Sequence, residues 1–168
     1  LHAFLTGSAA TLTRWARELT PPPAGCSYLN FTASHDGIGI RPIHGLISDD
    51  DLRRMIDQVR SAGGAVSSKT NPDGSTSPYE LNITWFDALR RPDRETDPLH
   101  AARFLASQTL PLALQGIPAV YFQALTARPN NVEELRKTGR ARSINRGHWK
   151  ESELQALLDT PESEPGRL

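Results

Sequence analysis

The sequence predicts an α/β fold, because stretches with helical periodicity alternate along the chain with short apolar runs that are typical of strands. Residues 8–19 and 48–62 repeat their apolar side chains at helical spacing, whereas residues 29–34 and 117–122 are short and largely apolar. The length of 168 residues suits one domain.

The first predicted helix covers residues 8–19 and places Leu12, Trp15 and Leu19 on one face. Three consecutive prolines, at positions 21–23, end it, because proline lacks the backbone N–H and clashes with the preceding turn. The apolar run at residues 29–34 follows as a candidate strand. It ends in His35 and Asp36.

A second helix is marked by signals at both ends. Ser48 can cap it, with Asp51 at the third position, and Gly63 and Gly64 end it. Between these ends the apolar side chains recur at helical spacing, at Leu52, Met55, Ile56 and Val59. Residues 65–77 are rich in Ser, Gly, Asn and Thr and contain an Asn-Pro-Asp-Gly turn signal, so we expect a mobile surface loop there.

The remaining elements follow in the second half. Residues 79–83 suit a short strand that leads into a helix from Thr84 to about Arg90, and Asp97-Pro98 suits a cap and first turn of a long helix that Pro111 ends or kinks. A buried strand at 117–122 and a final amphipathic helix at 151–158 complete the prediction. We assign four aromatic side chains to core packing: Trp15, Trp85, Phe104 and Phe122.

Composition excludes several classes of function. Nineteen Lys and Arg residues balance nineteen Asp and Glu residues, which argues against general attraction to nucleic acid or to an anionic membrane. No apolar stretch approaches the length of about 20 residues that spans a bilayer. Cys26 is the only cysteine, so no internal disulfide can form, and a reducing cytoplasm is the simplest expectation. The histidines lack the mutual spacing of a metal site, and we expect no metal and no other cofactor.

His35 and Asp36 are the first candidate functional residues. In a barrel of alternating strands and helices, polar side chains at the carboxyl ends of strands face the reaction site. Asp36 therefore suits a functional carboxylate. The alternative is a turn-forming aspartate, because the Asp-Gly pair at 36–37 favours turns, and His35 could instead be a strand-end histidine satisfied by the backbone.

Four segments occur in an order that resembles a known family: NFTASHDGIG at 30–39, PYELNI at 78–83, GIPAVY at 116–121 and RSINR at 142–146. This order resembles the sucrose-phosphorylase-like branch of glycoside hydrolase family 13, the alpha-amylase superfamily, across residues 1–158. The resemblance implies a fragment of a (β/α)8 TIM barrel, which typically needs about 250 residues. Residues 1–37 would be the end of the sixth helix and the seventh strand. Residues 38–92 would be an inserted α+β subdomain that roofs the active site, and residues 93–168 the seventh helix, eighth strand and C-terminal helix.

The resemblance also implies roles for individual residues. Asp36 matches the carboxylate that stabilises the transition state by hydrogen bonding to sugar hydroxyls, and His35 matches a neighbouring sugar-binding histidine. Arg142 matches an arginine that reaches toward the bound glucose, a task that suits a planar guanidinium. The nucleophile and general acid would follow the fourth and fifth strands, which are absent, so we expect this chain alone to be catalytically silent. An alternative for Arg142 is a solvated basic loop, and a basic run of this kind can also contact phosphates of nucleic acid.

Tyr79 and Glu80 match a mobile loop on the acceptor side, where phosphate and the leaving group alternate. Sucrose phosphorylases usually carry Gln at the position of Glu80, so the motifs are more similar to the glucosylglycerate phosphorylase subgroup, whose acceptor is anionic glycerate. Glu80 would repel an inward phosphate, and we expect it to bind acceptor hydroxyls or to support an arginine. The implied partners are an α-glucoside and inorganic phosphate, with retention of configuration.

Other interpretations remain open at this point. The parent could be a sucrose phosphorylase or an amylase-type hydrolase, the chain could be a noncatalytic binding or scaffold domain, and Tyr79 and Glu80 could be surface residues of an edge strand. A cut barrel would expose strand edges, so we also expect the isolated chain to associate with copies of itself.

Overall fold

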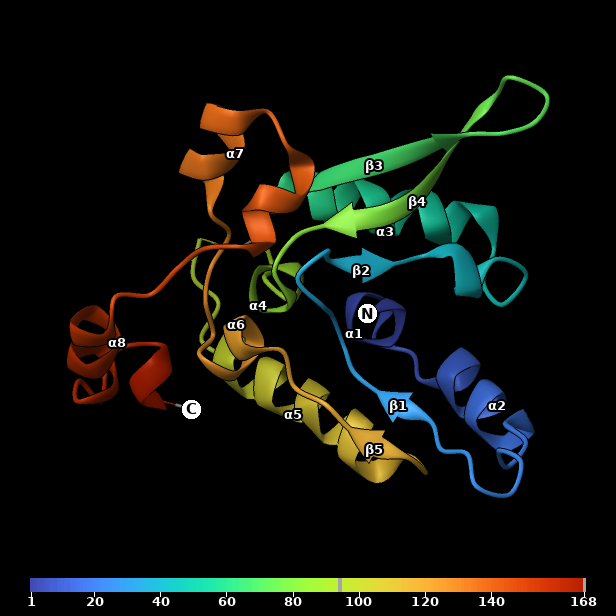
Figure 1. Ribbon diagram of the computed structural model, residues 1–168, viewed down its shortest axis with the longest axis horizontal. Coiled ribbons are helices and arrows are strands. Elements are labelled where there is room, and N and C mark those ends of the chain that lie inside the picture. The colour runs from blue at the N-terminus through green and yellow to red at the C-terminus, as the bar shows by residue number, and fades with distance from the viewer. Residues whose placement is uncertain (94, 168) are drawn as a thin grey trace.

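The computed structural model describes residues 1–93 and 95–167 and has an antiparallel sheet at one end and a parallel strand pair with helices at the other (Figure 1). The three-stranded sheet has the order β2-β4-β3, and the parallel pair consists of β1 and β5. The alternating sequence pattern predicted a mixture of helices and strands, and the structure confirms this mixture.

The antiparallel sheet contains β2 (Ile38–Gly39), β3 (Ala65–Thr70) and β4 (Thr76–Asn82). The prediction of a mobile loop over residues 65–77 is wrong, because β3 and β4 form a hairpin whose turn lies at residues 71–75. The turn signal was correct. The strand was missed because Ser and Thr side chains in residues 65–70 suit a solvated sheet edge as well as a loop.

A β-bulge interrupts the hairpin at Tyr79. Ser67 pairs with Glu80 and Ser68 pairs with Pro78, so Tyr79 is an extra residue on β4. Its carbonyl accepts a hydrogen bond from the backbone N–H of Ile40 instead. Bulges bend a strand and redirect side chains, and here the bulge lies beside Glu80.

Helix α3 (Asp49–Ser61) supplies much of the core beneath this sheet. Its predicted cap is confirmed, because the Ser48 hydroxyl accepts a hydrogen bond from the Asp51 N–H at 3.1 Å. The four predicted apolar positions are buried, and they join side chains of the β4–α4 segment in one cluster that includes Leu81, Ile83, Phe86 and Leu89.

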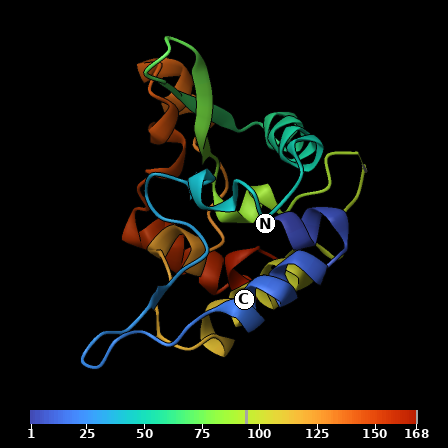
Figure 2. The same cartoon turned by 90° about the vertical axis from the view of Figure 1, so that its right-hand side faces the viewer.

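The other end holds α1 (His2–Thr6), α2 (Ala10–Glu18), β1 (Leu29–Asn30), β5 (Ile117–Pro118) and α5 (His100–Ala113). Figure 2, turned by 90°, shows that α2 and α5 both lie at this end of the molecule. An apolar groove of about 520 Å³ lies between the α1–α2 segment, β1 and the end of α5. Asn30 on β1 donates to the carbonyl of Leu114, just after α5, at 3.2 Å.

The remaining elements are short. They are η1 (Arg41–Ile43), α4 (Trp85–Ala88), α6 (Phe122–Leu125), α7 (Val132–Thr138), η2 (Ala141–Asn145), α8 (Glu151–Leu158) and η3 (Pro165–Arg167). Helix α4 is fastened to α5, because Trp85 Nε1 donates to Ser107 Oγ at 2.7 Å. The amide oxygen of Asn130 accepts from the Thr84 N–H at 2.9 Å, which ties the segment before α7 to the start of α4.

Several predicted boundaries are wrong. Helix α5 begins at His100 instead of Pro98, because Asp97 forms an ion pair with Arg103 and is not the cap. Pro111 lies inside α5, which continues to Ala113. Neither predicted apolar strand keeps its full length, since β1 and β5 contain two residues each.

The prediction that residues 117–122 are a buried strand is also wrong. Ile117 is 58% exposed, and Phe122, which was predicted to pack in the core, is 50% exposed at the start of α6. An apolar run predicts burial, but it does not say what covers the strand. Within the part of the chain that the structure describes, no other segment covers the apolar side chains of Ile117 and Val120, so they are exposed. Trp85 and Phe104 are buried as predicted, whereas Trp15, also predicted to pack in the core, is only half-buried and lines the apolar groove.

Candidate functional site

Asp36 lies in a tight turn between β1 and β2. The backbone groups of Ser34 and Gly37 exchange two hydrogen bonds of 3.1 Å, and Ser34 Oγ accepts from the Asp36 N–H at 3.2 Å. Gly37 has a φ of +122°, and a Cβ at this position would collide with the Leu81 carbonyl oxygen. Asp36 is therefore both a turn residue and a candidate functional residue, because the hydrogen bonds of the turn fix the backbone that carries its carboxylate.

Two buried asparagines hold this turn from separate segments of the chain. The carbonyl oxygen of Asp36 accepts from Asn82 Nδ2 at 3.0 Å and from Asn145 Nδ2 at 3.1 Å. Asn82 is the last residue of β4, and Asn145 is the last residue of η2. The backbone of Asp36 is thus fixed to two segments that lie 46 and 109 positions further along the chain.

The carboxylate of Asp36 faces three positive or ionisable groups. Its Oδ1 accepts from Arg146 Nη2 at 2.7 Å and lies 3.5 Å from Arg142 Nη1 and 3.3 Å from His35 Nε2. The predicted proximity of Asp36 and Arg142 is confirmed. The side chain of Asp36 keeps 30% of its surface exposed, so a ligand from solvent can reach it.

Arg142 joins Asp36 to Glu80. Its Nε and Nη2 donate to the two carboxylate oxygens of Glu80 at 2.9 and 3.1 Å, a bidentate arrangement that a lysine cannot form. These hydrogen bonds raise the pKa of the Arg142 guanidinium above its ordinary value, and the charge of Glu80 adds to the effect. Arg142 therefore remains charged, and Glu80 supports an arginine, which was one of its two predicted roles.

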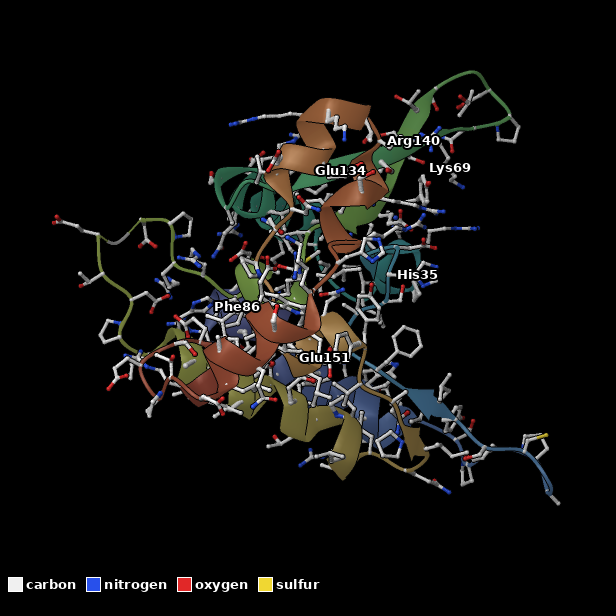
Figure 3. The ribbon with its side chains drawn as sticks, turned by 60° about the vertical axis from the view of Figure 1, so that its left-hand side comes forward. His35, Lys69, Phe86, Glu134, Arg140 and Glu151 are labelled. Carbon is white, nitrogen blue, oxygen red and sulfur yellow. The ribbon has the colours of Figure 1, made fainter. Side chains whose placement is uncertain are left out.

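His35 and Tyr121 lie on the open side of the cluster. The two rings meet edge to face with centroids 6.5 Å apart, and His35 has 61% of its side chain exposed. In Figure 3, His35 lies at the surface, below the hairpin residue Lys69 and below Arg140. Tyr121 donates from its hydroxyl to the carbonyl of Asn145 at 2.9 Å, and burial raises its pKa, so the phenol stays protonated at neutral pH.

Tyr79 lies at the bulge next to Glu80. The structure thus gathers the five predicted site residues, His35, Asp36, Tyr79, Glu80 and Arg142, in one region. Three segments carry them: the β1–β2 turn, β4 and η2.

Sequence reasoning missed four residues of this region: Asn82, Tyr121, Asn145 and Arg146. All four stand inside the segments that carried the family resemblance, and that position was the available signal. Tyr121 follows the run 117–120, so the rule that polar residues after strands face a site could have found it.

The cluster balances its charges, since two carboxylates, Asp36 and Glu80, face two guanidinium groups, Arg142 and Arg146. The cluster can donate hydrogen bonds to a neutral polyhydroxylated ligand and accept hydrogen bonds from it. Within residues 1–93 and 95–167, no three His, Cys, Asp or Glu side chains are grouped as a metal site would require. In the same described part of the chain, no helix has the length and apolar character needed to cross a membrane.

Comparisons with known proteins give consistent results. No family model matches the sequence. The chain is 39% identical to a glucosylglycerate phosphorylase of Allomeiothermus silvanus over 100% of its own length and 30% of the relative, and 41% identical to one of Spirochaeta thermophila over 97% of its length and 27% of the relative. A sucrose phosphorylase of Agrobacterium vitis is 30% identical over 96% of this chain and 32% of the relative.

A solved structure has the same fold. Sucrose 6F-phosphate phosphorylase from Thermoanaerobacter thermosaccharolyticum superimposes with a TM-score of 0.78, over 95% of this chain and 31% of that protein, at 22% sequence identity. The chain spans only about 30% of the length of the relatives it matches.

These findings confirm the resemblance stated from the motifs, and the chain is a homologue of the sucrose-phosphorylase-like enzymes. Within that class, the three relatives with 36–41% identity are glucosylglycerate phosphorylases, whereas the sucrose phosphorylases have 25–30% identity.

Proposed function

We propose that this chain is part of a glucoside phosphorylase, in which a larger polypeptide transfers a glucosyl group from an α-glucoside to inorganic phosphate with retention of configuration. The product is α-glucose 1-phosphate. The observation that carries this proposal is the convergence of Asp36, Arg142 and Glu80 from three separate segments that each resemble the family. In the remaining polypeptide, a carboxylate nucleophile and a carboxylic acid would lie about 5 Å apart, as retaining transfer requires.

Asp36 stabilises the transition state in this proposal. Positive charge develops on the sugar ring as the glycosidic bond breaks, so hydrogen bonds from the sugar 2- and 3-hydroxyls to a fixed carboxylate strengthen. The two arginines hold the Asp36 carboxylate in position, and His35 binds the same sugar from its exposed position.

Glu80 and Tyr79 belong to the acceptor side. Because Arg142 binds both oxygens of Glu80, the carboxylate is neutralised and does not repel an approaching phosphate. The Tyr79 phenol donates a hydrogen bond to phosphate or to the leaving group. Because both carboxylates, Asp36 and Glu80, are paired with arginines, the same site can receive an anion beside them.

We propose glucosylglycerate as the α-glucoside, in preference to sucrose. The higher identity to glucosylglycerate phosphorylases and the glutamate at position 80 support this choice.

The chain is further proposed to be the last quarter of a (β/α)8 barrel, with residues 38–92 as the inserted subdomain over the site. The exposed apolar side chains along β1 and β5 support this, because an apolar strand pair needs a cover. They are Leu29, Phe31, Ile117 and Val120. In the larger protein the rest of the barrel covers them, and without it the chain associates with itself.

Phosphorolysis by the larger polypeptide tests the proposal. Incubated with α-glucosylglycerate and phosphate, it should release α-glucose 1-phosphate, and sucrose should give a much lower kcat/KM. Release of free glucose without the phosphate ester would identify a hydrolase and contradict the proposal. The 168-residue chain alone should release no glucose 1-phosphate above a heat-killed sample.

A further inference from the structure

Asn82 is a fully buried amide at the end of β4, and every one of its side-chain hydrogen-bonding groups is used. Its exposed fraction is 0%. Nδ2 donates to the Asp36 carbonyl at 3.0 Å and to Glu80 Oε2 at 2.9 Å, and Oδ1 accepts from Ser67 Oγ at 2.6 Å. The two N–H groups and the amide oxygen therefore have fixed roles, and the orientation of the amide is defined.

These contacts connect two parts of the site that come from different segments. The Asp36 turn lies between β1 and β2, whereas the Glu80–Arg142 pair joins β4 to η2. The Asn145 side chain also donates to the Asp36 carbonyl. The backbone carbonyl of Asn145 accepts from the Tyr121 hydroxyl, so Asn145 ties the turn to Tyr121. Asn82 lies two residues after Glu80 on the same strand, so both side chains point to the same side of the hairpin.

We infer that Asn82 is a positioning residue, which holds the Asp36 turn and the Glu80–Arg142 pair at a fixed separation. The inference rests on the proposed function, because it assigns Asn82 to the same glucoside site. Asn82 is inside the protein and does not touch the substrate. It acts through the backbone of Asp36 and the carboxylate of Glu80.

Hydrogen exchange of the chain itself tests the coupling without an activity assay. Asn82→Leu has similar volume and loses all three hydrogen bonds. We expect amides in residues 34–40 to exchange at least about tenfold faster than in the unmodified chain, the factor that corresponds to losing one hydrogen bond to a charged group. Exchange in residues 52–59 of α3 should change by less than about threefold.

A matched control separates this effect from general damage to the hairpin. Asn71→Leu makes the same change at the other end of the hairpin, where Asn71 Nδ2 donates to Ser75 Oγ. It should accelerate exchange near residues 71–76 and leave residues 34–40 unchanged. If Asn82→Leu does not accelerate residues 34–40, or accelerates α3 equally, Asn82 has no positioning role.

Asn82→Asp supplies a second variant with a distinctive pH response. At neutral pH its carboxylate faces Glu80 and the Asp36 carbonyl and repels both, while Arg142 remains paired to Glu80. Burial and the adjacent charge favour protonation, and a protonated carboxyl can donate one of the lost hydrogen bonds. The ratio of its exchange rates to those of the unmodified chain in residues 34–40 should therefore fall as pH decreases from 7.5 to 5. A ratio independent of pH would contradict this role.

Kinetics of the larger polypeptide provide the remaining measurement. Asn82→Asp should lower kcat more than it raises KM, and kcat relative to the unmodified enzyme should recover as pH falls. If the unmodified enzyme makes no glucose 1-phosphate, the proposed function fails, while the exchange measurements still decide whether Asn82 holds the turn.

Discussion

At the scale of single residues, the site depends on shared hydrogen-bond partners. Arg142 contacts both Asp36 and Glu80, and Asp36 contacts both Arg142 and Arg146. Each guanidinium has a planar set of donors that can serve two acceptors at once, whereas an ammonium group is a point charge. Substitutions that keep the charge but change the geometry should therefore reduce function.

Arg142→Lys tests this geometry. The lysine retains a positive charge but cannot bind both oxygens of Glu80 and still face Asp36, so kcat/KM of the larger enzyme should fall roughly tenfold to a hundredfold. Steady-state phosphorolysis measures the effect. Arg140→Lys, an exposed position two residues earlier, is the control and should retain full activity. Equal loss in both variants would show that charge in this loop matters more than the bidentate contact.

A second residue-scale prediction concerns the pH dependence of stability. Hydrogen bonds from Arg103 lower the pKa of Asp97 from its ordinary value of 3.8. A carboxyl with a lowered pKa in the folded state stabilises the fold above its unfolded-state pKa, and this contribution is lost as pH falls through the folded-state pKa.

Asp97→Asn should thus lower the free energy of unfolding by about 1–3 kcal/mol at pH 7. The difference from the unmodified chain should shrink only below a pH of about 3.8. Urea unfolding at a series of pH values measures it. Asp93→Asn, at an exposed position in the same loop, serves as a comparison with a smaller expected effect. A difference that persists unchanged at pH 2.5 would contradict the assigned ion pair.

At the scale of elements, the turn between β1 and β2 places the carboxylate, and Gly37 is the residue that permits it. Its left-handed φ and its contact with the Leu81 carbonyl leave no space for a side chain. The close approach of the turn to β4 is what lets Asn82 reach the Asp36 backbone.

Gly37→Ala should accordingly destabilise the chain by at least about 2 kcal/mol, because backbone strain and overpacking add. Gly39→Ala is a matched control on β2, since a Cβ there meets nothing within 4 Å. Thermal unfolding followed by circular dichroism compares the two. If Gly37→Ala were as stable as Gly39→Ala, the turn would not have the geometry described.

The elements also indicate what sequence patterns can predict. The capped helix α3 and the final helix α8 were predicted almost to the residue, because caps and helical periodicity are local signals. The hairpin β3–β4 was missed, since pairing between strands depends on partners that lie elsewhere in the chain. The site residues matched to the family motifs came together, but the hydrogen bonds of Asn82 and Tyr121 to other segments follow only from the placement of the strands in space.

At the scale of the whole molecule, the antiparallel sheet and the parallel strand pair differ in how completely they are covered. The core beneath β4 is buried, whereas the strand pair β1–β5 exposes large apolar side chains. Exposed edges and apolar faces of strands promote association with other chains.

Light scattering of the isolated chain at tens of micromolar should therefore detect dimers or larger species. Ile117→Lys places a charge on β5, where the isoleucine is 58% exposed, and should shift the population toward monomer. Leu158→Lys, at the end of α8 and away from the strand pair, is the control and should leave association unchanged. A strictly monomeric unmodified chain would contradict this prediction.

The central proposal, that Asp36 stabilises the transition state of glucosyl transfer to phosphate, is tested most directly by Asp36→Asn in the larger polypeptide. The amide preserves size but removes the negative charge, so kcat for phosphorolysis of α-glucosylglycerate should fall by about 10²-fold or more. Asp73→Asn, in the hairpin turn, should have no such effect. A kcat for Asp36→Asn within about threefold of the unmodified enzyme would remove Asp36 from the reaction and contradict the assignment of this site.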